Sequence, residues 1–207
     1  MPHQGYFRSV LKPKCNRTAC GSTSKMHTVM KMFMSTVSFH WFGALMDESE
    51  KLIQQGHQLM SEGEYQQALS KFEKAIKANP NNAEAYYLKA EAAVLVSKVS
   101  VEEVIALYKK AISLDAKNPF YYSSLGAFCV DAGQFNEAEA AYNKAAEVDP
   151  DNAPYYYSEF AVGYNRRAPE VMEQYLDDNT RAMIQKKALK YLLKSIGLDE
   201  EKAKKLL

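Results

Sequence analysis

Two stretches of this sequence, seventy residues apart, follow the same pattern. Residues 62–82 and 132–152 both run Gly, aromatic, Ala, aromatic, Ala, Pro at identical offsets. The matching positions are Gly63, Tyr65, Ala68, Phe72, Ala75 and Pro80 in the first stretch, and Gly133, Phe135, Ala138, Tyr142, Ala145 and Pro150 in the second. A pattern that recurs at a fixed distance indicates copies of one small structural unit. We therefore expect the chain to fold as an array of such units.

The spacing of apolar and small residues predicts that each unit is a helical hairpin. One apolar stripe with helical spacing precedes Gly63 and a second follows it, until Asn79 and Pro80 end the pattern. The stripes consist of Leu52, Gly56 and Leu59, and then of Ala68, Phe72, Ala75 and Ile76. Small residues let the two helix backbones approach closely, while the Phe72 and Tyr65 rings fill the remaining gap. Such a hairpin has apolar groups on both sides, so it needs copies of itself to stack on.

Aligned on these positions, the chain contains three copies of the unit, at residues 49–82, 83–118 and 119–152. Equivalent slots hold Leu52, Tyr86 and Tyr122; Gly56, Ala90 and Gly126; Ala68, Val104 and Ala138; Phe72, Tyr108 and Tyr142; and Ala75, Ala111 and Ala145. The middle copy has two extra residues in its turn, where Ser100 and Glu103 have the spacing of a capping box. In the same copy, Ala116 replaces the expected proline.

A 34-residue period with this pattern resembles the tetratricopeptide repeat. The resemblance implies an all-α fold, a solenoid of helical hairpins in which the first helices of successive repeats line a concave groove. A degenerate fourth repeat is expected at 153–199, where residues 188–199 parallel residues 68–79 in register. Phe160 occupies a slot that requires a small residue, and sixteen extra residues lengthen the turn, so we expect the second helix to pack at an altered angle. Residues 200–207, with Asp199 as N-cap, predict a terminal helix that shields the last apolar face.

The composition changes abruptly at Met46. The net charge is +6 for residues 1–46, which lack acidic residues, −8 for residues 47–165 and +3 for residues 166–207. Residues 1–45 also lack helical or strand periodicity, so we expect the repeat array to occupy residues 46–207. We expect the leader to be disordered or to precede the true start at Met46. A targeting segment and an anchor or secretion signal remain as alternatives.

The sequence carries little that points to chemistry. Motifs for phosphate binding, zinc proteases or nucleophilic hydrolysis are absent, and His57 is the one histidine after Met46. Cys129 lies on an apolar stripe, where a buried inert thiol is the expected state. Three cysteines without paired spacing favour a reducing compartment, and no apolar run is long enough to span a membrane. We expect a cytoplasmic protein that is not an enzyme and has no cofactor, metal or membrane partner.

The resemblance implies that the second, fifth, ninth and twelfth slots of each repeat line the concave groove. They hold Glu50, Ile53, His57 and Met60; then Glu84, Tyr87, Glu91 and Val94; then Phe120, Ser123, Ala127 and Val130; and Tyr157 continues the row. Tyr87, Phe120 and Tyr157 lie outside the packing slots, where they either anchor a ligand or cover neighbouring helices. The glutamates either form a solvated face or attract a basic segment. The candidate site is therefore Glu50, Ile53, His57, Glu84, Tyr87, Glu91, Phe120, Ser123 and Tyr157.

The best-known subclass of the family binds acidic C-terminal tails of heat-shock chaperones through a clamp of Lys, Asn and Arg. The corresponding positions here hold Ile53, His57, Leu88, Phe120 and Ser124, none of which matches, so this partner class is not expected. The sequence instead predicts an adaptor whose groove binds a peptide segment of another protein, with apolar anchors and basic flanks. Self-association through the C-terminal helices is the alternative. Nucleic-acid binding is disfavoured because the repeats carry a net negative charge.

Overall fold

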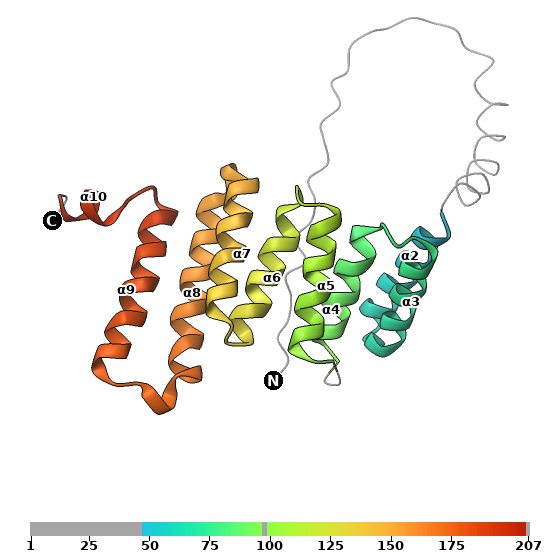
Figure 1. The fold of residues 1–207 in the computed structure, drawn as a ribbon, viewed down its shortest axis with the longest axis horizontal. Coiled ribbons are helices and arrows are strands. Elements are labelled where there is room, and N and C mark those ends of the chain that lie inside the picture. Colours follow the sequence, from blue (N-terminus) through green and yellow to red (C-terminus); the bar gives the residue numbers. More distant parts are fainter. Residues whose placement is uncertain (1–46, 97–98, 206–207) are drawn as a thin grey trace, which may run out of the picture. The chain divides into compact units, whose positions relative to one another are not determined.

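The computed structural model describes residues 47–96 and 99–205. The chain divides into two units, residues 1–45 and 46–207, and the expected leader lies outside the described residues. Throughout the part of the second unit that is described, the regular structure consists of α-helices and short 3-10 turns, without a strand (Figure 1). The expected all-α class is therefore confirmed.

Three helical hairpins follow one another along the chain (Figure 1). Their helices are α2 (Glu48–Ser61) with α3 (Tyr65–Ala78), α4 (Ala83–Val94) with α5 (Val101–Leu114), and α6 (Pro119–Asp131) with α7 (Phe135–Val148). The two helices of each hairpin pack on each other, and each hairpin packs on the next through α3 and α4, and then through α5 and α6. This is the order of contacts that a stack of repeats requires.

Local signals in the sequence explain where these helices begin and turn. Gly63 and Gly133 occupy the turns with φ angles of 80° and 76°, a left-handed conformation that favours glycine. The expected capping box is present: the Ser100 hydroxyl accepts a hydrogen bond from the Glu103 N–H, and the Glu103 carboxylate accepts one from the Ser100 N–H. Asn82 caps α4 in a similar way by accepting a hydrogen bond from the Ala85 N–H.

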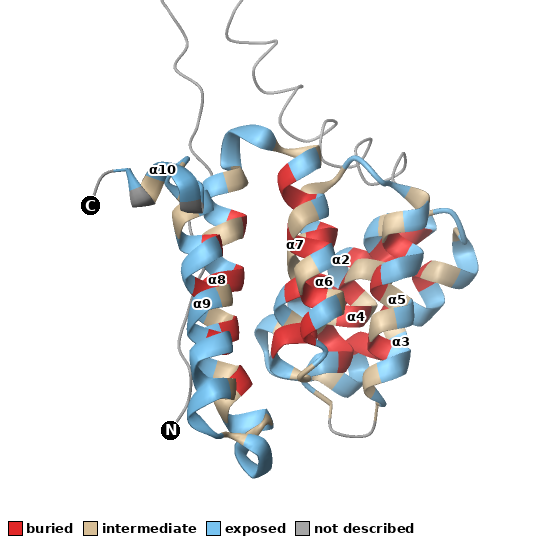
Figure 2. Cartoon of the chain, turned by 60° about the vertical axis from the view of Figure 1, so that its left-hand side comes forward, coloured by how far each residue is buried: buried red, intermediate tan, exposed pale blue. Residues whose placement is uncertain are grey.

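Buried residues gather along the faces that the helices turn toward one another (Figure 2). In the first hairpin the Phe72 ring of α3 lies directly over Gly56 of α2, so close that a Cβ atom at residue 56 would meet the ring at 2.3 Å. Tyr142 covers Gly126 in the third hairpin in the same way, at 2.7 Å. Full burial of a ring such as that of Phe72 contributes about 1.5–3 kcal/mol relative to exposure. Glycine at these two slots is what allows the rings to enter.

The fourth hairpin departs from this arrangement. It consists of α8 (Ala153–Val171), which follows the 3-10 turn η1 (Pro150–Asn152), and of α9 (Asp178–Ser195), which follows the 3-10 turn η2 (Glu173–Tyr175). Phe160 is fully buried on α8 and contacts the rings of Tyr164 and Tyr191, with centroids 5.5 and 4.6 Å away. The alignment with the first repeat assigns the ring slot to Leu192, but Leu192 is 41% exposed and Tyr191 is buried instead. Phe160 already fills the space that a ring from the second helix occupies in the first and third hairpins, so α9 presents a different face to α8.

The expected terminal helix is present as α10 (Glu200–Lys204), and the Asp199 carboxylate caps it by accepting a hydrogen bond of 2.7 Å from the Lys202 N–H. Among the described residues, however, α10 contacts α9 and leaves four large apolar side chains of the preceding helix segment exposed. These are Met183, Leu189, Leu192 and Ile196. Five residues are too short to cover these side chains, so the described part of α10 does not provide the shielding that we expected.

Candidate peptide-binding groove

A hollow of about 500 Å³ is lined by the C-terminal ends of the first helices of the first three repeats and by Val101 and Tyr108 of α5. Met60 of α2 closes one side, Val94 and Leu95 at the end of α4 form the middle, and Ala127 and Phe128 of α6 lie opposite. Polar groups in its lining come from Glu91, Tyr108, Ser124 and Asp131. The lining is thus largely apolar with two carboxylates, which is the chemistry of a site for apolar side chains carried on a neutral or basic segment.

The candidate residues on α4 and α6 belong to the helix faces that line this hollow. Glu84, Tyr87, Glu91 and Val94 follow one another on α4 at spacings of three or four residues. Phe120, Ser124, Ala127 and Asp131 do the same on α6. Residues with this spacing share one face of a helix. Phe120, whose side chain is 67% exposed, therefore extends the α6 face by one turn beyond the hollow.

Tyr87 and Glu91 have partners within the protein. Tyr87 is half-buried, with its ring centroid 5.0 Å from that of Tyr121, and its hydroxyl is hydrogen-bonded to Ser124 at 3.4 Å. Glu91 accepts a hydrogen bond of 2.7 Å from the hydroxyl of Tyr108. Burial, and then the charge of Glu91, raise the pKa of Tyr108 far above its usual value, so the phenol stays protonated and continues to donate. Tyr87 thus covers the junction between α4 and α6, which was one of its two expected roles.

The other candidate residues divide between the surface and the core. Glu50 and Glu84 are exposed, as is His57, whose ring meets the edge of Phe72 at 6.2 Å. Ile53 is buried and contributes to packing rather than to a contact surface. Ser123 donates a hydrogen bond of 3.1 Å to the carbonyl of Phe120, one turn earlier in the same helix.

Tyr157 lies apart from the α4 and α6 faces, because its ring packs against α9. The Tyr157 and Tyr191 centroids are 6.0 Å apart, and the Lys194 ammonium lies 4.1 Å from the Tyr157 centroid. A cation over an aromatic face at this distance is an attractive contact. Of the nine candidate residues, the structure therefore brings Glu91 alone into the lining of the hollow. Tyr87 and Phe120 lie one turn away from the lining along α4 and α6, and Tyr157 lies in the fourth hairpin.

Sequence reasoning missed Leu95 and Asp131 in the lining. Both follow the twelfth slot of their repeats by one residue, so the hollow extends further toward the C-terminal ends of the first helices than the slots suggest. Leu95 is the C-cap residue of α4 and Asp131 is the last residue of α6. Including the thirteenth slot of each repeat among the groove positions would have predicted both residues.

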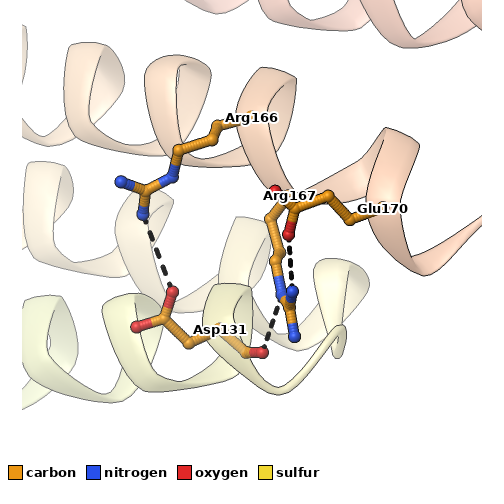
Figure 3. A network of polar contacts seen from close by, with 4 residues as sticks. All are labelled: Asp131, Arg166, Arg167 and Glu170. Carbon is orange, nitrogen blue, oxygen red and sulfur yellow. Dashed lines mark hydrogen bonds and ion pairs between the residues drawn. The ribbon is translucent and has the colours of Figure 1, made fainter. Parts of the chain in front are cut away.

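The C-terminal end of α6 is held by two arginines of α8 (Figure 3). Arg167 donates a hydrogen bond of 3.1 Å to the carbonyl of Asp131 and pairs with Glu170 at 2.6 Å, while Arg166 lies 3.8 Å from the Asp131 carboxylate. The last carbonyls of a helix lack partners within it, and a guanidinium that reaches one of them satisfies it. The arginine pair therefore fixes the edge of the hollow at Asp131 and partly neutralises its charge.

Cys129 is buried beside the hollow, and burial raises the pKa of its thiol to about 11, so it is uncharged at neutral pH. Residues 47–96 and 99–205 contain no cluster of three or more potential metal ligands. None of the helices in the same residues is long and apolar enough to cross a bilayer.

Comparison with known protein families gives two matches within the array. A sequence model of the TPR repeat matches residues 56–96, and one of the tetratricopeptide repeat matches residues 121–152. The chain contains tetratricopeptide repeats. Repeats of this family typically form non-catalytic protein-interaction scaffolds, and the solenoid fold expected from the sequence is confirmed.

Solved structures of tetratricopeptide-repeat proteins resemble the fold. MamA is 22% identical, with a TM-score of 0.58 over 80% of this chain and 86% of its own. The Arabidopsis OM64 TPR domain is 23% identical, with a TM-score of 0.50 over 59% of this chain and 96% of its own. The first TPR of Spaghetti (RPAP3), bound to the HSP90 peptide SRMEEVD, is 20% identical, with a TM-score of 0.51 over 60% and 93%. The comparison with curated proteins found no match.

Proposed function

We propose that this chain is a cytoplasmic, non-catalytic adaptor that holds a peptide segment of a partner protein in the hollow between α2, α4 and α6. The observation that carries the proposal is the hollow itself, which is about 500 Å³ in volume and largely apolar. The side chains of Val94 and Leu95 line it while remaining 45% and 53% exposed. Apolar groups that remain exposed in a concave site gain free energy when a ligand covers them.

The charge of the repeats favours a segment with apolar anchors and basic flanks. Glu50 and Glu84 are exposed in the first turns of α2 and α4, and residues 47–165 carry a net charge of −8. Complementary charge accelerates association and selects among partners. An acidic chaperone tail, such as the peptide bound to the RPAP3 domain, would instead meet repulsion. The clamp positions support the same conclusion, because Ile53 and Leu88 are buried and Phe120 is apolar.

Nucleic acid is a poorer partner, because several of the basic residues that suggested it have partners within the protein. Arg166 and Arg167 pair with Asp131 and Glu170, Lys187 forms an ion pair with Glu139, and Lys194 lies over Tyr157. Phosphate contacts require a basic face, and the repeats are acidic.

Affinity capture with the full chain tests the proposal. The parent protein is compared with the double variant Val94→Gln/Leu95→Gln, which changes two exposed side chains of the hollow, and with Tyr175→Gln, which changes an exposed side chain of η2 as a control. We expect proteins retained by the parent and by Tyr175→Gln to be lost or weakened at least tenfold in the double variant. Equal retention by all three proteins would contradict binding in the hollow.

A further inference from the structure

A second apolar surface lies on α9, the second helix of the fourth hairpin. Ala182, the polar Gln185, Leu189, Leu192 and Ile196 are all exposed. They follow one another at spacings of three, four, three and four residues, so they form one continuous stripe along the helix. Alternating spacings of three and four are the pattern by which one helix packs along another. Leu189 and Ile196 are 55% and 69% exposed, so nothing within the described protein covers the stripe.

The stripe forms one wall of a groove. A cavity of about 330 Å³ lies between α8 and α9, with Leu189 and Leu192 on one side and Val162 on the other. Ala161 and Ala188 are buried and form its floor. Small residues at the floor let an incoming helix approach closely, and leucine side chains on the wall give it an apolar contact. In Figure 2 the buried residues of the α8–α9 hairpin lie on the side that faces the other hairpins, and the opposite side is exposed.

The groove has the place in the array that the first helix of a further repeat would take. The α4 helix packs on α2 and α3, α6 packs on α5 and meets α4 where Tyr121 contacts Tyr87, and α8 packs on α6 and α7. The first helix of each later repeat thus contacts both helices of the hairpin before it. After α9 the chain turns at Gly197, whose φ is 74°, and continues as the short α10, which does not line the cavity. Within the described residues, the last hairpin therefore presents a helix-receiving surface that α10 leaves open.

Basic residues border this surface. Of the five basic residues of α9, Lys187 and Lys194 turn away from the stripe, toward Glu139 and Tyr157. Arg166 lines the cavity from α8 and pairs with Asp131 only at 3.8 Å, with both side chains largely exposed. Arg181 and Lys186 flank the stripe on opposite sides by helical spacing and are exposed. The rim is therefore suited to a ligand that carries acidic side chains beside its apolar ones.

We propose that the groove between α8 and α9 docks an amphipathic helix of a partner protein, with apolar residues at spacings of three and four and with acidic flanks. The helix takes the place of the first helix of a fifth repeat. A second copy of this chain is a poorer occupant, because pairing two α9 stripes would bring Arg181, Lys186 and their copies together as like charges. The proposal concerns a site separate from the hollow, and it requires no peptide in the hollow.

A selection experiment tests it. A displayed library of helical peptides, with fixed leucines at spacings of three and four and with randomised flanking positions, is selected on the full chain. Selected peptides are then measured against the parent, against Leu189→Gln/Leu192→Gln, and against Met183→Gln, which alters an exposed residue of α9 outside the stripe. We expect flanks enriched in Asp and Glu, a loss of at least tenfold in affinity for the double variant, and no change for Met183→Gln. Exchanging Arg181 and Lys186 for Ser is expected to weaken binding and to flatten its salt dependence.

Three results would overturn the proposal. The first is no enrichment, and the second is enrichment of peptides that bind the double variant as tightly as the parent. The third is a concentration-dependent doubling of the parent's mass in light scattering that Leu189→Gln/Leu192→Gln abolishes, because that result would assign the surface to a second copy. The Val94→Gln/Leu95→Gln variant keeps the terminal groove intact, so the selected peptides should bind it normally. Loss of the peptide there would show that the two sites are not separate.

Discussion

Gly126→Ala isolates the contact on which the third hairpin depends. The added Cβ would lie 2.7 and 2.8 Å from two carbons of the Tyr142 ring, whereas carbon atoms pack best at about 3.5–4.0 Å. The ring would have to retreat by roughly 1 Å to restore that separation. Tyr142 is buried, and Phe160 of α8 lies beyond it with a centroid distance of 6.0 Å, which limits the retreat. The second repeat has Ala90 at this slot opposite Tyr108, so alanine fits only where the ring has room.

Two opposing effects set the magnitude. Overpacking a buried contact costs about 1–3 kcal/mol. Replacing glycine by alanine inside a helix raises the free energy of unfolding by about 1 kcal/mol. The net expectation is a loss of about 0–2 kcal/mol of unfolding free energy, or a decrease of up to roughly 8 °C in Tm at about 2–4 °C per kcal/mol. Gly163→Ala is the matched control, because its Cβ would meet Val130 at 3.2 Å, where a small shift suffices. That variant should be neutral or more stable than the parent.

Thermal unfolding followed by circular dichroism, with both glycine variants measured in the parent and in a Tyr142→Leu background, checks this reasoning. With the ring removed, Gly126→Ala should become stabilising, giving a coupling free energy of about 1–3 kcal/mol between residues 126 and 142. An increase in Tm for Gly126→Ala in the parent, equal to that for Gly163→Ala, would refute the close ring contact.

Three further predictions follow from the packing. Ala138→Leu should lower the free energy of unfolding by about 1–3 kcal/mol because residue 138 is fully buried. Ala140→Leu, on the exposed side of α7, should leave it nearly unchanged. Equal Tm values for the two variants would contradict the repeat register. Tyr87→Ala should destabilise the protein by about 2 kcal/mol or more because its ring packs on Tyr121, whereas Phe120→Ala should change stability by less than about 0.5 kcal/mol in urea unfolding. Glu139 is partly buried, which opposes ionisation, but hydrogen bonds from Lys187 and Tyr191 lower its pKa below 4.5. Its contribution to stability is therefore present above that pH and lost as the pH falls through the lowered pKa. Glu139→Gln should flatten the acid side of a plot of unfolding free energy against pH. An unchanged plot would contradict the ion pair.

The sequence was sufficient for the repeated part of the fold because each slot there is decided by local spacing and residue size. The absence of a side chain at Gly56 matches the large ring at Phe72 on the opposing helix. Ser100 and Glu103 mark the start of α5 before any long-range contact is considered. The fourth hairpin was harder to predict, because Phe160 replaces a small residue and moves burial from Leu192 to Tyr191. That shift depends on the space left by Tyr142 and Tyr164, which a slot alignment does not contain.

The sequence predicted which helix face carries the candidate residues, but not which residues of the protein they contact. The periodicity placed Glu84, Tyr87 and Glu91 on one side of α4, and the structure keeps them there. It could not reveal that Glu91 accepts a hydrogen bond from Tyr108, or that Tyr157 packs under Lys194, because both contacts join residues whose distance depends on how the hairpins stack. Leu95 and Asp131 were missed because each lies at the end of its helix, beyond the slots of the repeat.

Photo-crosslinking from residue 120 tests the central claim, that a peptide segment binds along the first helices, most directly. Phe120 is replaced in the full chain by the photoreactive amino acid p-benzoylphenylalanine, which changes an exposed side chain, and Tyr175 is replaced in the same way as a control. After irradiation in cell extract, crosslinked segments are identified by mass spectrometry. The account predicts that residue 120 captures segments with apolar anchors and basic flanks, that residue 175 does not, and that Val94→Gln/Leu95→Gln removes these adducts. Adducts at residue 120 that persist in the double variant, or that consist of acidic tails, would contradict it.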